Sequence, residues 1–165
     1  SGSFTIVGDR AQARHGFTET WAERLTRVGI DDITVRSLSV NYRTPAPVMA
    51  AAEPVIRAAI PDANVPTSIR DGLPVTYAAL ADAEEILTAW LDTHDGIACV
   101  IGAAPQQPVS QHARVRHLTP ELAKGLEFDL VMVLEPARFG EGIEGAVDRY
   151  VAMTRATGQL VIAGK

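Results

Sequence analysis

Four short segments of the sequence carry residue types that bind phosphate or orient an attacking water. They are residues 8–12 (GDRAQ), 41–45 (NYRTP), 124–127 (KGLE) and 150–156 (YVAMTRA). Arginine presents a planar fork of donors that matches a phosphate, and glycine lets the backbone approach a ligand closely. Together these segments contain the side chains that a site for a phosphorylated ligand needs.

Each segment alone also has an ordinary structural interpretation. Asp9 can close a turn with its own side chain, and Arg43 can form a surface ion pair. Lys124 and Glu127 can pair on a solvated turn, and Arg155 can lie on the outside of a helix. Without further information these interpretations stay open beside the functional ones.

The elements that must position these segments follow from the spacing of apolar residues. Short apolar or β-branched runs predict strands at residues 4–7, 33–40, 73–80, 97–101, 115–119, 129–134 and 160–163. Helical spacing predicts helices over residues 17–28, 45–59, 82–91 and 147–154. Residues 62–72, 102–111 and 140–145 are expected to be loops.

Helix ends are predicted from capping residues and glycines. Thr44 is expected to cap the helix that begins at Pro45, and Asp82 resembles the start of a capping box. Gly29 and Gly158 are placed to end two other helices.

Alternating strands and helices predict an α/β fold with a mostly parallel sheet. In open α/β sheets, ligands bind beyond the carboxyl ends of the strands. We therefore expect the four polar segments to converge on that edge of the sheet.

The composition excludes some classes of function. The chain has 165 residues, 15 Lys and Arg against 20 Asp and Glu, and a net charge of −5, so it exerts no global attraction on nucleic acid. Arg114, Arg116 and His117 form the best local basic cluster, with a solvated loop as the alternative.

Cys99 is the only cysteine and lies in an apolar run, which favours a packed thiol and a cytoplasmic protein. The histidines lack zinc-site spacing, and no apolar run is long enough to span a membrane.

In order and spacing, the four segments resemble motifs III to VI of the UvrD-like superfamily 1 helicases. Residues 8–12 resemble G-D-x-x-Q, and residues 41–44 resemble N-Y-R-S/T. Residues 123–128 (AKGLEF) resemble the core of motif V, and residues 151–156 (VAMTRA) resemble V-x-x-T-R-A. The resemblance extends from residue 8 to the final strand.

This resemblance implies a RecA-like, three-layer α/β/α fold and half of an ATP site. In the family, ATP with Mg²⁺ lies between two RecA-like domains, and the first domain supplies the phosphate-binding glycine loop and the magnesium ligands. This sequence contains no G-x-x-x-x-G-K-[ST]. Residues 1–30 are therefore expected to be the tail of the first domain, and residues 31–165 the second domain. The isolated chain is expected to be inactive.

The resemblance also assigns roles to individual residues. Arg155 is expected to be the arginine finger, with Arg43 contacting the γ-phosphate and Gln12 sensing it from the side of the first domain. Tyr42 is expected to stack on the adenine. Glu127 is expected near the ribose and phosphates, and the neighbouring Lys124 and Gly125 are expected to contact the nucleotide.

Two departures from the family pattern bear on the partner. Glu121 stands where motif V usually has histidine, and the stretch between Arg43 and Thr119 is too short for the usual accessory insertion. Both features resemble the HelD branch, whose members bind RNA polymerase and release it from nucleic acid. The expected partners are thus the first RecA-like domain, nucleic acid (DNA rather than RNA) and RNA polymerase, with no membrane. The alternative is a non-catalytic RecA-like module that binds a protein partner.

Overall fold

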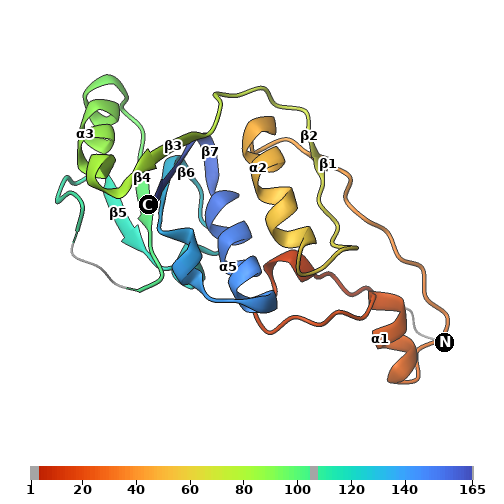
Figure 1. Ribbon diagram of the computed structural model, residues 1–165. Coiled ribbons are helices and arrows are strands. Elements are labelled where there is room, and N and C mark those ends of the chain that lie inside the picture. Colours follow the sequence, from red (N-terminus) through yellow and green to blue (C-terminus); the bar gives the residue numbers. More distant parts are fainter. Residues whose placement is uncertain (1–3, 105–107, 165) are drawn as a thin grey trace.

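The computed structural model describes residues 4–104 and 108–164, so part of the predicted 102–111 loop and the first three residues of the predicted domain tail lie outside it. Its centre is a five-stranded sheet with the order β3-β7-β6-β4-β5, in which all neighbouring strands are parallel (Figure 1). The strands are β3 (Thr76–Ala79), β4 (Ala98–Ile101), β5 (Val115–Leu118), β6 (Phe128–Leu134) and β7 (Ala156–Gly164).

Helices cover both faces of this sheet (Figure 1). The helices α2 (Ala46–Arg57) and α5 (Gly142–Met153) pack on one face, and α3 (Ala83–Thr93) packs on the other. The remaining elements are two shorter helices, α1 (Trp21–Arg27) and α4 (Pro120–Ala123), and the 3-10 turns η1 (Arg10–Gln12), η2 (Leu80–Asp82) and η3 (Pro136–Phe139). The predicted three-layer α/β/α, RecA-like fold is confirmed.

The buried strands form because both of their faces are apolar. Along β4, Cys99 and Ile101 belong to the core beneath α2 and α5, whereas Ala98 and Val100 belong to the core beneath α3. This alternation is the two-residue period of a strand between two helical layers. Burial raises the pKa of the Cys99 thiol to about 12, in keeping with the predicted packed cysteine.

Two of the predicted strands are wrong. Residues 4–7 form no strand, and of residues 33–40 only Val40 belongs to one, β1 (Val40–Asn41). It pairs with β2 (Thr67–Ser68), inside the predicted loop at residues 62–72. Residues with high strand propensity form a strand only where a neighbour accepts their backbone hydrogen bonds, and the main sheet ends at β3.

The predicted helix ends are confirmed in one case and wrong in others. Gly29 follows α1 with a φ of 86°, a left-handed conformation that suits glycine, as predicted. Asp82 makes no capping hydrogen bond, because η2 leads directly into α3 and holds Asp82 in a helical conformation. The predicted loop at residues 140–145 is also shorter than expected, since α5 begins at Gly142. Gly158 does not end α5 but lies within β7.

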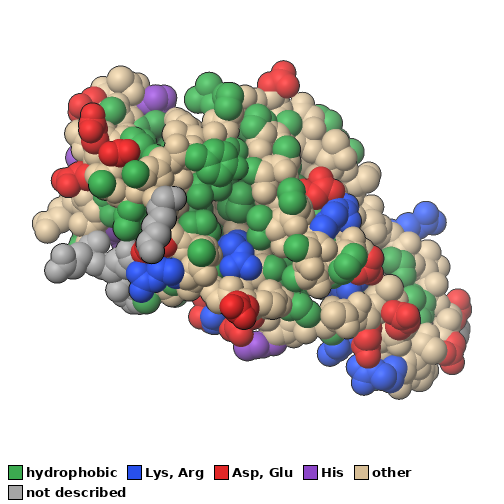
Figure 2. Space-filling model, viewed as in Figure 1, with side chains coloured by type: hydrophobic (Ala, Val, Ile, Leu, Met, Phe, Trp, Pro, Cys, Tyr) green, Lys and Arg blue, Asp and Glu red, His purple; other side chains and the backbone are tan. Residues whose placement is uncertain are grey.

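Both arginines of the predicted basic cluster are bonded to the backbone. The Arg114 guanidinium donates to the carbonyls of Leu91, His94 and Gly96 at the end of α3. Arg116 donates to the carbonyl of Ala113 at 2.8 Å. These contacts favour a structural role over nucleic-acid binding. On the face drawn in Figure 2, basic and acidic side chains alternate and do not gather into one basic field.

His117 on β5 predicts a pH-dependent stability. Burial lowers the pKa of His117, and its Nε2 has no hydrogen-bond partner among the described residues. Below the ordinary pKa of 6.5 the unfolded chain binds a proton that the folded chain resists, so the free energy of unfolding falls as pH drops. We expect His117→Gln to flatten this dependence in urea unfolding between about pH 7.5 and 5.5. His15→Gln, at an exposed histidine, is the control, and an equal flattening by it would contradict the assignment.

Among the described residues, no helix combines the length and the apolar character needed to cross a bilayer.

Candidate functional site

Three of the predicted site residues lie at the amino-terminal ends of β6 and β7: Glu127, Arg155 and Arg43. Glu127 directly precedes β6 and Arg155 directly precedes β7, and the first residues of these strands pair in register. The site is therefore not at the carboxyl ends of the central strands, where we expected it. The reason is that α5 runs back across the sheet, so that its last residues lie where β7 begins.

Arg43 reaches this place from the segment between β1 and α2. Its Nη1 donates to Glu127 Oε1 at 2.8 Å, across 84 positions of sequence. Both side chains are about half exposed, at 43% and 46% of their surface. An ion pair this open adds little to stability, so both charges remain accessible to a ligand.

Arg155, by contrast, is almost completely buried, with 2% of its surface exposed. Its Nε donates to the carbonyl of Val151 at 3.1 Å, and its Nη2 donates to Thr154 Oγ1 at 3.3 Å. None of the ion pairs between described residues includes Arg155. The interpretation of Arg155 as a solvated helix-surface arginine is therefore wrong.

The charges of Arg43 and Glu127 act on the Arg155 guanidinium. Burial lowers the pKa of the Arg155 guanidinium most, and the neighbouring Arg43 lowers it further, while Glu127 opposes both. Both Arg43 and Glu127 therefore act on Arg155, although only Arg43 bonds to Glu127, and we call these three residues the Arg155 cluster. A third guanidinium lies close by, because Arg70 Nη1 donates to the carbonyl of Arg43 at 3.0 Å. The Arg155 cluster thus holds two cations and one anion, with Arg70 bonded to its backbone and Asp9 acting on Arg155 as a second anion.

The conformation of residues 42–44 is set by Asn41, a residue to which no role was assigned from its type or position. Asn41 Oδ1 accepts from the backbone N–H groups of Arg43 and Thr44 at 2.9 and 3.0 Å. Thr44 was predicted to cap α2, but the helix starts after Pro45, and Thr44 Oγ1 is buried without a hydrogen-bond partner. An asparagine between a strand and a helix often closes such a turn, and that signal was present in the sequence.

The predicted adenine-stacking residue, Tyr42, projects from the same turn. Its surface is 73% exposed, so the ring is uncovered. An uncovered aromatic ring beside an arginine presents a face on which a base can stack.

The segment 8–12 also lies at this cluster. Asp9 accepts from Ala11 N at 2.9 Å and from Gln12 Nε2 at 2.7 Å, so the predicted Asx-type turn is present and it orients the Gln12 amide. Asp9 is close enough to Arg155 to raise the pKa of its guanidinium. Gln12 is thus linked to Arg155 through Asp9, and no hydrogen bond between described residues joins it to Arg43, Glu127 or Arg155 directly.

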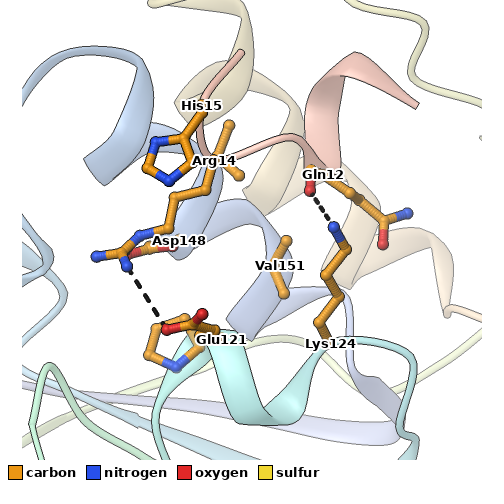
Figure 3. A pocket seen from close by; sticks show the side chains of 9 residues that line it. Gln12, Arg14, His15, Glu121, Lys124, Asp148 and Val151 are labelled. Atoms are coloured by element: carbon orange, nitrogen blue, oxygen red, sulfur yellow. Dashed lines mark hydrogen bonds and ion pairs between the residues drawn. The ribbon is translucent and has the colours of Figure 1, made fainter. Parts of the chain in front are cut away.

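Lys124 and Gly125 connect this segment to the turn before β6. Lys124 Nζ donates to the carbonyl of Gln12 at 2.8 Å (Figure 3). Gly125 follows with a φ of 80°, which a residue with a side chain rarely adopts. The turn thereby places Glu127 next to Arg43 and the Lys124 ammonium next to the segment 8–12.

Two arginines that fix this segment were not predicted. Arg10 is buried and donates to Asp62 at 2.7 Å and to the carbonyl of Thr18 at 2.8 Å. Arg14 reaches carboxylates of α4 and α5. No pattern in the sequence distinguishes these arginines from surface arginines.

An open pocket of about 240 Å³ lies between this segment and the helices α4 and α5 (Figure 3). Its polar lining comes from both sides, with Gln12, Arg14 and His15 on the segment and Glu121, Lys124 and Asp148 on the helices.

Known structures share the fold. The C-terminal domain of a possible DNA helicase from Lactobacillus plantarum aligns with a TM-score of 0.54 and 16% identity over 75% of this chain and 87% of that one. The arterivirus nonstructural protein 10 helicase aligns less well, with TM-scores of 0.48 in its DNA complex and 0.47 without DNA. Identities there are 21% and 20%, over 79% of this chain and 26% of the viral protein.

No protein-family model matches the sequence, and no curated protein matches it. The structural similarity to the Lactobacillus domain therefore supports the fold alone. By fold, this chain is a RecA-like α/β domain of the kind found at the C-terminus of that possible helicase.

Proposed function

We propose that this chain is the second motor domain of an ATP-driven superfamily 1 helicase or translocase, and that it completes an ATP site with a first RecA-like domain. The observation that carries the proposal is that Arg43, ion-paired to Glu127, and the buried Arg155, whose Nη1 donates to the carbonyl of Leu126 beside Glu127, come to the same strand ends. The motifs that resemble the UvrD-like helicases supply the same residues independently.

The arrangement fits a phosphate. A buried cation is costly unless an anion or several good acceptors compensate it, and Arg155 has backbone and hydroxyl oxygens but no carboxylate in bonding distance among the described residues. A phosphate group would supply that anion, and arginine binds its oxygens through paired hydrogen bonds. Arg43 is free to turn toward the same group because its pair with Glu127 is half exposed.

In this proposal, the residues of the chain hold and orient the nucleotide. Arg43 and Arg155 hold the γ-phosphate, Tyr42 stacks on the adenine, and Gln12 orients the attacking water. Glu127, with Lys124 and Gly125 beside it, lines the ribose and phosphates. Bound ATP supplies the transferable phosphoryl group, with Mg²⁺ held mainly by the first domain.

Hydrolysis would be coupled to domain movement through the same arginines. Arg155 is fixed by the backbone of its own domain, so it moves with that domain as a rigid body. Loss of the γ-phosphate removes the group that holds the two domains together, and the cleft opens. Repeated closure and opening would move the protein along nucleic acid, with DNA as the preferred partner, in the cytoplasm.

A narrower role as a HelD-like factor that releases RNA polymerase is part of the proposal. It is supported by Glu121 at the histidine position of motif V and by the short stretch between Arg43 and Thr119. The mildly acidic surface also fits a protein that does not bind nucleic acid through this domain alone.

The test is ATP hydrolysis by the longer protein that joins this domain to its first motor domain. We expect turnover by that protein and none by this chain alone. Stimulation by single-stranded DNA would favour a helicase, and stimulation by RNA polymerase would favour the release factor. Turnover by the chain alone would contradict the half-site. Absence of turnover in the longer protein under every condition would favour the non-catalytic partner-binding module.

A further inference from the structure

Arg14 occupies an unusual electrostatic position. Its Nε lies 2.9 Å from Glu144 Oε1 and 3.2 Å from Asp148 Oδ2, and its Nη1 lies 3.6 Å from Glu121 Oε2. Two of these carboxylates come from α5 and one from α4, whereas Arg14 belongs to the N-terminal segment (Figure 3). We refer to Arg14 and its three carboxylates as the Arg14 clamp.

The three carboxylates are poorly placed without the arginine. Glu144 and Asp148 are four residues apart on one helix, where like charges repel each other. The side chain of Asp148 is only 10% exposed, so its charge is largely withdrawn from water. A buried carboxylate needs a partner, and Arg14 provides it from another part of the chain.

The clamp holds the segment that carries Asp9 and Gln12. Lys124 adds a second tether to this segment, through the carbonyl of Gln12. Asp9, whose carboxylate orients the Gln12 amide, acts on the charge of Arg155. Arg14 itself contacts none of Arg43, Glu127 and Arg155 through an ion pair. Its influence on that cluster therefore passes through the backbone between residues 9 and 14.

We propose that Arg14 is a positioning residue, whose ion pairs with Glu121, Glu144 and Asp148 hold residues 9–14 on α4 and α5 and thereby present Gln12 to the Arg155 cluster. The inference rests on the proposed function for the role of Gln12. The docking of the segment is independent of that function. The two parts are therefore tested separately.

Docking is tested in this chain by amide hydrogen exchange. The N–H of Ala11 donates to Asp9 Oδ1 and that of Ala13 donates to the carbonyl of Arg10, so both amides report on η1, a turn too short to persist without packing. We expect Arg14→Ala to speed exchange at both amides roughly tenfold, and Arg14→Lys to retain most of the protection. Arg27→Ala is the matched control, because Arg27 pairs with Glu19 inside the same N-terminal region.

A second variant tests the Arg14 clamp in case Arg14→Ala causes the domain to misfold. Glu121 is the most exposed partner, with 74% of its side chain accessible, so Glu121→Gln weakens the clamp without disturbing the core. We expect it to speed exchange by a smaller factor in the same two amides. Unchanged exchange in Arg14→Ala and Glu121→Gln would overturn the clamp.

Positioning is tested by ATP hydrolysis in the longer protein. We expect Arg14→Ala to lower kcat about tenfold with KM for ATP little changed, since Arg14 touches no nucleotide group, and Arg14→Lys to recover most of the rate. Faster exchange with an unchanged kcat would overturn the positioning role while leaving the proposed function intact. A wild-type protein without turnover would overturn the proposed function and the role of Gln12, and the exchange result on docking would stand.

Discussion

Replacing Arg155 by alanine is expected to lower the kcat for ATP hydrolysis of the longer protein by about 10³–10⁵-fold. The physical reason is that Arg155 is a rigid cation, fixed by the carbonyl of Val151, beside a second cation and one carboxylate. Such a preorganised guanidinium stabilises charge on the γ-phosphate without having to reorganise during the reaction. The measurement is steady-state hydrolysis with and without DNA or RNA polymerase.

This experiment needs controls because Arg155 is buried. Arg155→Lys keeps the charge but loses the planar fork, so it should recover little of the rate. Arg138→Ala is the matched control, since Arg138 is a surface arginine whose side chain is 66% exposed and pairs with Glu135. Thermal unfolding of each variant shows whether the domain remains folded. An unchanged rate in folded Arg155→Ala would mean that Arg155 does not reach the phosphates.

Replacing Gly158 by alanine is expected to lower the free energy of unfolding by about 1–3 kcal/mol. An added Cβ would lie 2.6 Å from the carbonyl oxygen of Asp129 on β6. Residues 156 and 159 of β7 pair with residues 128 and 130 of β6, so β7 contains one extra residue at this point. The overlap is with backbone at this bulge, and no side-chain rotation relieves it.

Urea unfolding of Gly158→Ala measures this effect, and Gly164→Ala is the control in the same strand. Chain neighbours aside, no atom of the described residues lies within 4 Å of a Cβ at Gly164, so that variant should change the free energy of unfolding by less than about 0.5 kcal/mol. Equal stability of the two variants would mean that the bulge widens without cost. Because Gly158 lies in the first stretch of β7, three residues after Arg155, loss of this packing should also loosen the Arg155 cluster.

The helices and the inner strands of the fold were predictable from the sequence. The apolar side chains of the run at residues 129–134 can be buried only if the strand lies between two layers of helices. This run forms β6. Val147, Tyr150 and Val151 have helical spacing and are buried on α5. Local patterns of this kind can be interpreted without distant residues, because the period of the apolar residues determines whether a segment forms a helix or a strand.

Strands at the margin were less predictable, because their formation depends on a distant partner. Residues 33–40 have strand composition, yet only Val40 pairs, and it does so with Thr67. The prediction that Gly158 ends a helix is wrong for the same reason. Its role depends on the carbonyl of Asp129, which approaches it only in the assembled sheet.

For the candidate site, the sequence alone was enough to identify the residue types that could bind a phosphate and their order along the chain. Arg43, Glu127 and Arg155 stand out by their motifs, and the folded chain brings them together. The tertiary structure alone decided that the site lies at the amino-terminal ends of β6 and β7. It also decided that Arg155 is buried and that Arg14 is held by three carboxylates. Charged residues have no periodicity that identifies their partners, so packing of the helices on the sheet determines which charges meet.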